Sequence, residues 1–93
     1  MFKKTFDEAT IEAVWRKGVQ DPNHSSFRID KCGASMQRNE HGEISQWGWE
    51  IDHIVPESKD GTDNLSNLRP LHWKNNRAKG DNLDGHWTCE ITS

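Results

Sequence analysis

The stretch Trp47-Gly-Trp-Glu-Ile-Asp-His-Ile-Val-Pro56 decides the fold, because it carries the strongest strand signal in the chain. Within it, Trp49, Ile51 and His53 fall on one face of an extended backbone, and the two acidic residues between them fall on the other face. Pro56 ends the predicted strand, since proline cannot donate to a sheet ladder.

The residues that follow complete a small structural unit. Residues 57–66 form a loop rich in turn residues. A returning strand is then expected from Leu68 to Leu71. A short helix is expected from Trp73 to Lys79, and Gly80 ends it. We therefore expect the core motif to cover residues 47–81.

One helix and one hairpin are predicted upstream of this motif. Apolar residues recur at helical spacing over about residues 6–17, and Gly18 is a natural stop. Thr5 and Glu8 have the spacing of a capping box, with Thr5 as N-cap. Two further short strands, around a turn, are expected at residues 27–29 and 34–36.

No internal repeat or linker divides the chain, so we expect one α+β domain over residues 1–93. Only 31% of the residues are apolar, which predicts a thin core and marginal stability. The tail from residue 81 should pack back through Trp87 and Ile91. No apolar run approaches the length of a membrane span, and no apolar leader is evident, which predicts a soluble cytoplasmic protein without a membrane partner.

The cysteine content fits that compartment. Cys32 and Cys89 allow at most one disulfide. Because nothing else in the sequence suggests a secreted scaffold held by disulfides, we expect two reduced thiols.

Charge is unevenly distributed along the chain. The net charge of −3 by itself disfavours a nucleic-acid partner. Residues 40–63 hold seven acids and one base, however, whereas residues 68–79 hold four bases and no acid. A local basic patch can bind a phosphate backbone even when the total charge is negative. The total still predicts weak, salt-sensitive association with nucleic acid.

The core motif carries the groups that phosphodiester hydrolysis needs. One imidazole can activate a water, and one metal ion can supply a counter-charge and assist the departing oxygen. Asp52 places a hard oxygen ligand beside the imidazole of His53, a side chain type with an ordinary pKa of about 6.5. The predicted helix can carry Asn76 toward the same place, and the amide of Asn67 could fix the orientation of the imidazole.

Read in order, these residues resemble the HNH endonuclease family. The resemblance rests on the segments Trp49-Glu-Ile-Asp-His-Ile-Val-Pro56 and Asn67-Leu-Arg-Pro-Leu-His-Trp-Lys-Asn-Asn-Arg-Ala-Lys-Gly-Asp81. It covers residues 47–81 closely, and residues 28–34 match the family's upstream hairpin more loosely. It implies a small ββα-metal (His-Me finger) fold, here with an added N-terminal helix and an upstream hairpin, and a metal-dependent endonuclease that cuts DNA.

The resemblance also implies a role for each motif residue. His53 would be the general base, and Asn67 would orient it by hydrogen bonding. Asn76, in place of a histidine, would bind the metal together with Asp52. Asn67 follows His53 by 14 positions and Asn76 follows Asn67 by 9, as in the family. Three basic residues of the predicted helix would contact DNA phosphates: Lys74, Arg77 and Lys79.

Some of these assignments have rivals. Asn64 lies close to Asn67 in sequence, and Asn75 precedes Asn76, about 100° away around a helix. The family spacing selects Asn67 and Asn76. Lys74 is equally well explained as part of a solvated helix face.

Two departures from the family pattern bear on the metals. Many relatives hold a structural zinc with two Cys-x-x-Cys pairs, and the corresponding positions here are Ile29 with Cys32 and His72 with Asn75. Two remaining ligands do not close a tetrahedral site, so we expect no structural zinc. Asn76 is an oxygen donor, which favours Mg²⁺ or Mn²⁺ as the single divalent cofactor.

The sequence leaves substrate and specificity open. A non-catalytic DNA-binding module and an RNase are the alternatives to a DNA endonuclease. A chain this short has little left for a dedicated recognition element, which predicts low sequence specificity or targeting by a partner protein. The resemblance implies a bacterial or phage protein.

Overall fold

The computed structural model describes residues 5–93, which form two α-helices, three short 3₁₀ helices (η1 to η3) and two antiparallel sheets. In chain order the elements are α1 (Glu8–Trp15), β1 (Val19–Gln20), β2 (Phe27–Ile29), β3 (Ser35–Gln37), η1 (Arg38–Glu40), β4 (Trp49–His53), η2 (Glu57–Lys59), η3 (Leu65–Asn67), β5 (Leu68–His72) and α2 (Trp73–Lys79). One sheet has the order β1-β2-β3, and the other pairs β4 with β5. The expected small α+β fold is confirmed.

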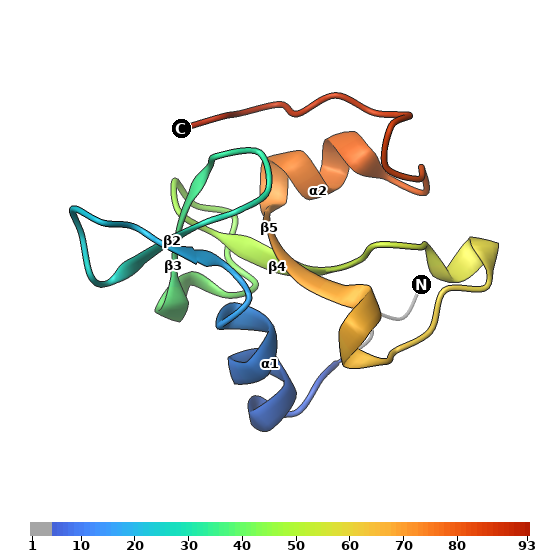
Figure 1. Ribbon diagram of the computed structural model, residues 1–93, viewed down its shortest axis with the longest axis horizontal. Helices are drawn as coiled ribbons and strands as arrows, with labels where there is room; N and C mark the ends of the chain where they lie inside the picture. Colours follow the sequence, from blue (N-terminus) through green and yellow to red (C-terminus); the bar gives the residue numbers. More distant parts are fainter. Residues whose placement is uncertain (1–4) are drawn as a thin grey trace.

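The β4–β5 ribbon lies between the two helices, which cover its opposite sides (Figure 1). Its register pairs Trp49 with His72 and His53 with Leu68. The main core lies between this ribbon and α1, where Trp49 is fully buried and its ring lies 5.2 Å from that of Trp15. Buried members of this core come from four elements: Ile11, Val14, Trp15, Met36, Trp49 and Leu68.

The polar side of β4 is covered as well. Asn76 and Lys79 of α2 contact the side chains of Glu50 and Asp52, which therefore face α2. Asp52 is only 4% exposed. The predicted division of the strand into two faces is confirmed, and the second face is a polar layer in which Asp52 is buried and Glu50 half-buried.

Helix α1 starts later than the capping-box spacing predicted. Asp7 is the N-cap, with an extended backbone and a side chain that accepts a hydrogen bond of 2.8 Å from the backbone nitrogen of Thr10. This contact lowers the pKa of Asp7. The assignment of Thr5 as N-cap is therefore wrong, because an aspartate two residues later is an equally good cap that lies closer to the first buried turn.

The upstream hairpin has a strand more than was predicted. β2 lies where expected and β3 starts one residue later, at Ser35. β1 pairs with β2, with Val19 opposite Ile29. The sequence did not reveal β1, because two exposed residues carry no alternating pattern.

Cys32 and Cys89 form a disulfide, so the expectation of two reduced thiols is wrong. The chain after α2 runs back along that helix (Figure 1), which brings the Cα atom of Cys89 to 5.9 Å from that of Cys32. Gly33, next to Cys32, has a φ of +93°, and a Cβ atom there would meet the carbonyl oxygen of Thr92 at 2.8 Å. The tail packs back as expected.

Asp30 holds this region together with a buried carboxylate that is 5% exposed. One oxygen accepts 2.9 Å hydrogen bonds from the backbone nitrogens of Cys32 and Ala34. The other accepts from the backbone nitrogen of His72, at 3.0 Å, and from Nδ2 of Asn75, at 3.1 Å. The hairpin turn is thereby joined to the start of α2.

Asn75 carries the connection on to the tail. Its Oδ1 accepts from the backbone nitrogens of Glu90 and Ile91, at 2.8 and 2.9 Å, and its Nδ2 also donates to the carbonyl oxygen of Ile91. We call Asp30, Cys32, Asn75 and Cys89 the tail anchor.

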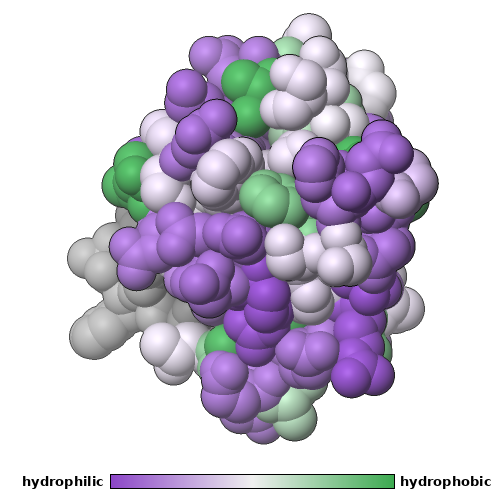
Figure 2. Space-filling view, turned by 90° about the vertical axis from the view of Figure 1, so that its left-hand side faces the viewer, coloured by the Kyte–Doolittle hydropathy of each residue, from purple (hydrophilic) through white to green (hydrophobic). Residues whose placement is uncertain are grey.

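The surface is mainly polar. The face shown in Figure 2 is largely hydrophilic, with hydrophobic residues only in small separate areas. Within residues 5–93, no helix is both long and apolar enough to cross a membrane.

Candidate functional site

A polar cleft of about 170 Å³ opens where β4 ends. Its walls come from β4, η2 and α2, which the β4–β5 hairpin and the following helix bring together. The structure thus places Asp52, His53 and Asn76 around one cleft. A second cavity, of about 600 Å³, shares His53, Glu57 and Asn76 with the cleft and extends to Phe6 and Arg77.

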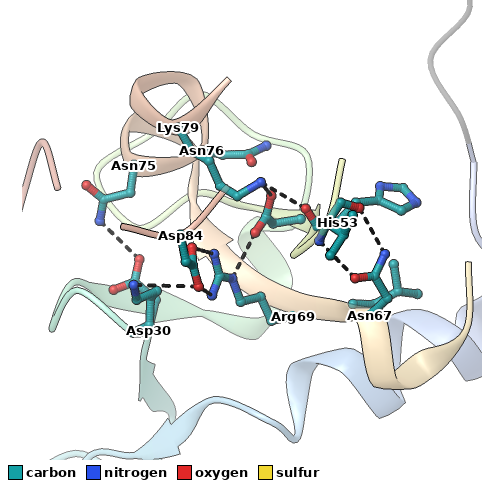
Figure 3. A network of polar contacts seen from close by, with 12 residues as sticks. Asp30, His53, Asn67, Arg69, Asn75, Asn76, Lys79 and Asp84 are labelled. Atoms are coloured by element: carbon teal, nitrogen blue, oxygen red, sulfur yellow. Dashed lines mark hydrogen bonds and ion pairs between the residues drawn. The ribbon is translucent and has the colours of Figure 1, made fainter. Parts of the chain in front are cut away.

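Two cations hold the carboxylate of Asp52. Nε of Arg69 donates to Oδ2 at 2.8 Å, and Nζ of Lys79 lies 3.2 Å from Oδ1 (Figure 3). Arg69 also donates two hydrogen bonds of 2.8 Å to Asp84. Burial by itself lowers the pKa of Arg69, but its hydrogen bonds to Asp84 and its attraction to Asp52 outweigh this and raise it.

Arg69 is a site residue that the sequence did not single out. It belongs to the basic segment of residues 68–79, but it lies on a strand, where no motif position marks it. Its place opposite Asp52 in the register of β4 and β5 explains the contact. Knowledge of that register would have been needed to find it.

Lys79 faces inward, with 1% of its residue surface exposed. Its ammonium group donates a 2.9 Å hydrogen bond to the carbonyl oxygen of His53, in addition to its contact with Asp52. These internal contacts fix the end of β4, and Lys79 also lines the cleft. The phosphate contact expected of Lys79 stays a prediction.

The imidazole of His53 is bound by Asp63. Nε2 lies 2.8 Å from Oδ1 of Asp63, and the side chain of His53 is 15% exposed. The ring centroid lies 6.1 Å from that of Phe6. The sequence did not identify Asp63, which lies in a loop whose composition indicated only turns.

Asn67 uses its side chain to close the loop after β4 (Figure 3). Its Oδ1 accepts from the backbone nitrogen of Val55 at 2.9 Å, while Nδ2 donates to the carbonyl oxygens of Val55 and Thr62 at 3.0 and 2.8 Å. The expectation that this amide hydrogen-bonds to the imidazole is corrected, because its donors and its acceptor serve the backbone.

Asn76 presents its amide to the cleft in a defined orientation. Nδ2 donates to Oε1 of Glu50 at 2.9 Å. Because a carboxylate only accepts hydrogen bonds, the amide oxygen is left on the side away from Glu50. Asn75, the rival in the sequence, is fully buried in the tail anchor.

Two sets of possible metal donors lie at or beside the cleft. Asp52 and Asn76 present oxygens, and a carboxylate has about four acceptor sites, of which Asp52 uses two. A second set was not expected from the sequence: one ligand atom each from His53, Glu57 and Asp63, all within 4.8 Å of one another. Carboxylate and amide oxygens suit a hard divalent cation, so the residues present fit the expected cofactor.

The positions that hold zinc in relatives have other partners here. Cys32 is in the disulfide. Nε2 of His72 binds the carbonyl oxygen of Gln46 at 2.8 Å, and Nδ1 accepts from the backbone nitrogen of Lys74.

Lys74 and Arg77 lie on the exposed side of α2. Their charged groups stand 5.5 and 5.1 Å from the centroid of the Trp73 ring. Such contacts hold long side chains in place while leaving their charge accessible. Arg77 also lines the larger cavity beside His53.

Comparisons with known proteins agree with this geometry. A model of the HNH endonuclease family matches residues 32–82, which is more than half of the chain and includes the cleft from β4 to α2. A search of curated proteins gave no match, and neither did a search of solved structures. The family match shows that the chain belongs to the HNH endonuclease family.

Proposed function

We propose that this protein is a metal-dependent endonuclease that hydrolyses phosphodiester bonds in DNA, with His53 as general base. The observation that carries the proposal is the shared cleft: the imidazole of His53, the carboxylate of Asp52 and the amide of Asn76 line it at the end of β4. These groups match the chemical needs of the reaction.

In this mechanism, His53 accepts a proton from a water molecule, whose oxygen attacks the phosphorus in line. The bond from phosphorus to the 3′ oxygen breaks, and this oxygen leaves with the bonding electron pair and takes a proton from solvent water to become a 3′ hydroxyl. A divalent cation, Mg²⁺ or Mn²⁺, held by Asp52 and Asn76 supplies positive charge beside the phosphate when bound. Arg69 and Lys79 fix Asp52, and Glu50 fixes the amide of Asn76, so the ligand groups are oriented beforehand.

We propose Arg77 and Lys74 as the residues that contact DNA phosphates near the cleft. Both are exposed and lie on α2, one and two positions from Asn76. With a net charge of −3, the chain should bind DNA weakly and with low sequence specificity, and a partner protein would supply targeting. Binding should weaken as salt is raised.

A supercoiled-plasmid assay with Mg²⁺, Mn²⁺ or EDTA tests the proposal. The parent should nick or linearise the plasmid with a metal and be inactive in EDTA. His53→Ala should lower the cleavage rate by about 10²–10⁴-fold, the usual value of a general base, and leave DNA binding nearly intact. His86→Ala, at an exposed histidine outside the cleft, is the matched control and should cleave like the parent.

Two results would contradict the proposal. Full cleavage by His53→Ala would show that another group activates the water. Binding of DNA without cleavage in either metal would indicate a non-catalytic module, and a parallel assay on a structured RNA separates an RNase from both.

A further inference from the structure

We propose that Asp63 is the positioning residue of His53, which it holds as the Nε2–H tautomer so that Nδ1 is the atom that accepts the proton from water. The catalytic purpose of this arrangement rests on the proposed function. The tautomer itself is a property of the folded chain and can be measured without any cleavage.

The contact defines the tautomer. Nε2 of His53 and Oδ1 of Asp63 are 2.8 Å apart, which is within the usual range of hydrogen-bond distances. A carboxylate has no proton to donate, so the hydrogen of this bond belongs to Nε2. A neutral imidazole carries one ring proton, and its lone pair is then on Nδ1.

The loop contacts explain why Asp63, and not Asn67, has this role. The amide of Asn67 is used by the backbone of Val55, two residues after His53, and by the carbonyl oxygen of Thr62, directly before Asp63. One amide thus holds the two chain segments that carry the base and its carboxylate. Asn67 acts on the imidazole through the position of Asp63.

Four further groups lie around His53 among the described residues, in addition to Asp63. Glu57 has an oxygen within 4.8 Å of the ligand atoms of His53 and Asp63. Lys79 contacts the carbonyl oxygen of His53, and Phe6 lies beside the ring. Arg77 lines the same cavity.

A competing interpretation places a cation between His53, Glu57 and Asp63. It makes the opposite prediction for the ring proton, because a metal bound at Nε2 leaves the proton on Nδ1. The two interpretations therefore differ in an observable that does not depend on activity.

The experiment records ring ¹⁵N signals of the full chain with labelled histidine, at a pH where the ring is neutral, before and after addition of Mg²⁺. The parent should show protonated Nε2 and unprotonated Nδ1 at His53, with or without the cation. Asp63→Ala should move His53 toward a mixture of tautomers. Asp63→Asn keeps the shape of the side chain and an acceptor oxygen, so His53 should retain most of the Nε2–H form in this variant. It is the control for a loss of folding in Asp63→Ala.

Cleavage kinetics provide the second readout. Asp63→Ala should lower kcat by about 10–10²-fold with little change in KM, and Asp63→Asn should lose less. Glu43→Gln removes the same charge from an exposed residue that lines neither cavity and should behave like the parent in both readouts.

A parent with protonated Nδ1, an Asp63→Ala variant with the parental tautomer, or transfer of the proton to Nδ1 on addition of Mg²⁺ would each overturn the assignment. If the parent fails to cut nucleic acid, the proposed function fails and the tautomer result still decides the role of Asp63.

Discussion

The cleft and the tail anchor are two polar regions that differ in how far apart their residues lie in the sequence. Three of the four motif residues line the cleft, and all three lie within residues 52–76, in one hairpin and the helix that follows it. The tail anchor joins residues as far apart as Cys32 and Cys89, 57 positions along the chain. The two regions meet at consecutive residues of α2, where Asn75 belongs to the anchor and Asn76 to the cleft.

The two regions also differ in how their charges are compensated. At the cleft the carboxylate of Asp52 is compensated by two cations, Arg69 and Lys79. In the tail anchor the single carboxylate of Asp30 accepts four hydrogen bonds and lies among neutral groups. The cleft thus compensates its buried carboxylate by ion pairs, and the anchor does so by hydrogen bonds alone.

The largest expected effects separate the two adjacent asparagines. Asn76→Ala removes a proposed metal ligand and should therefore lower the cleavage rate by about 10²-fold or more. The unfolding free energy should change little. Asn75→Ala breaks four hydrogen bonds at a fully buried side chain and should lower the unfolding free energy by about 3 kcal/mol. Urea denaturation and the plasmid assay, run on both variants, measure the two effects.

Each asparagine variant is the control for the other. Below the unfolding transition, Asn75→Ala should still cut DNA. Equal losses of stability in the two variants would show that cleft and anchor are one cooperative polar network.

What the sequence could predict follows the same division. The strand, the loop and α2 have strong local signals, so the β4–β5–α2 unit and the residues around its cleft were predicted. Pairings between distant segments have no local signal. For this reason the disulfide, the hydrogen bonds to the carboxylate of Asp30 and the contact of Arg69 with Asp84 were missed. The roles of Lys79, Asn67 and Asp63 depend on the direction of each side chain, and a motif position does not specify that direction.

Reduction of the disulfide should have the second largest effect. Linking residues 57 positions apart restricts the unfolded chain, and loss of such a link typically costs about 2–4 kcal/mol. We expect a loss of about 2 kcal/mol, at the lower end of that range, because Asn75 still holds the tail. Urea denaturation with and without a reductant measures it, and a Cys32→Ser, Cys89→Ser double variant should match the reduced parent.

The cleavage rate of the reduced protein tests whether the disulfide also affects the geometry of the cleft. The reduced protein should cut DNA at the rate of the oxidised protein while it remains folded, since neither Cys32 nor Cys89 is among the described residues that line the cleft. A fall in rate at unchanged folded fraction would show that the tail shapes the site.

The smallest expected effect tests Asp84, the residue through which the tail reaches Arg69 and so Asp52. Hydrogen bonds from Arg69 and from Trp87 hold the pKa of Asp84 well below its ordinary value. The unfolded chain therefore binds more protons than the folded protein as pH falls below about 4, so acid removes the stability that this contact contributes near neutrality. Asp84→Asn should be slightly less stable at neutral pH and should lose stability less steeply below about pH 4, as measured by urea denaturation across that range. The effect is small because the side chain of Asp84 is 39% exposed and solvent screens the pair.

Asp7 and Glu12 also have lowered pKa values, but the parent and the variant both carry these residues, so their contributions cancel in the comparison. Parallel acid profiles for parent and variant would show that the contact with Arg69 contributes nothing to folding, and the tail would then be held by the anchor alone.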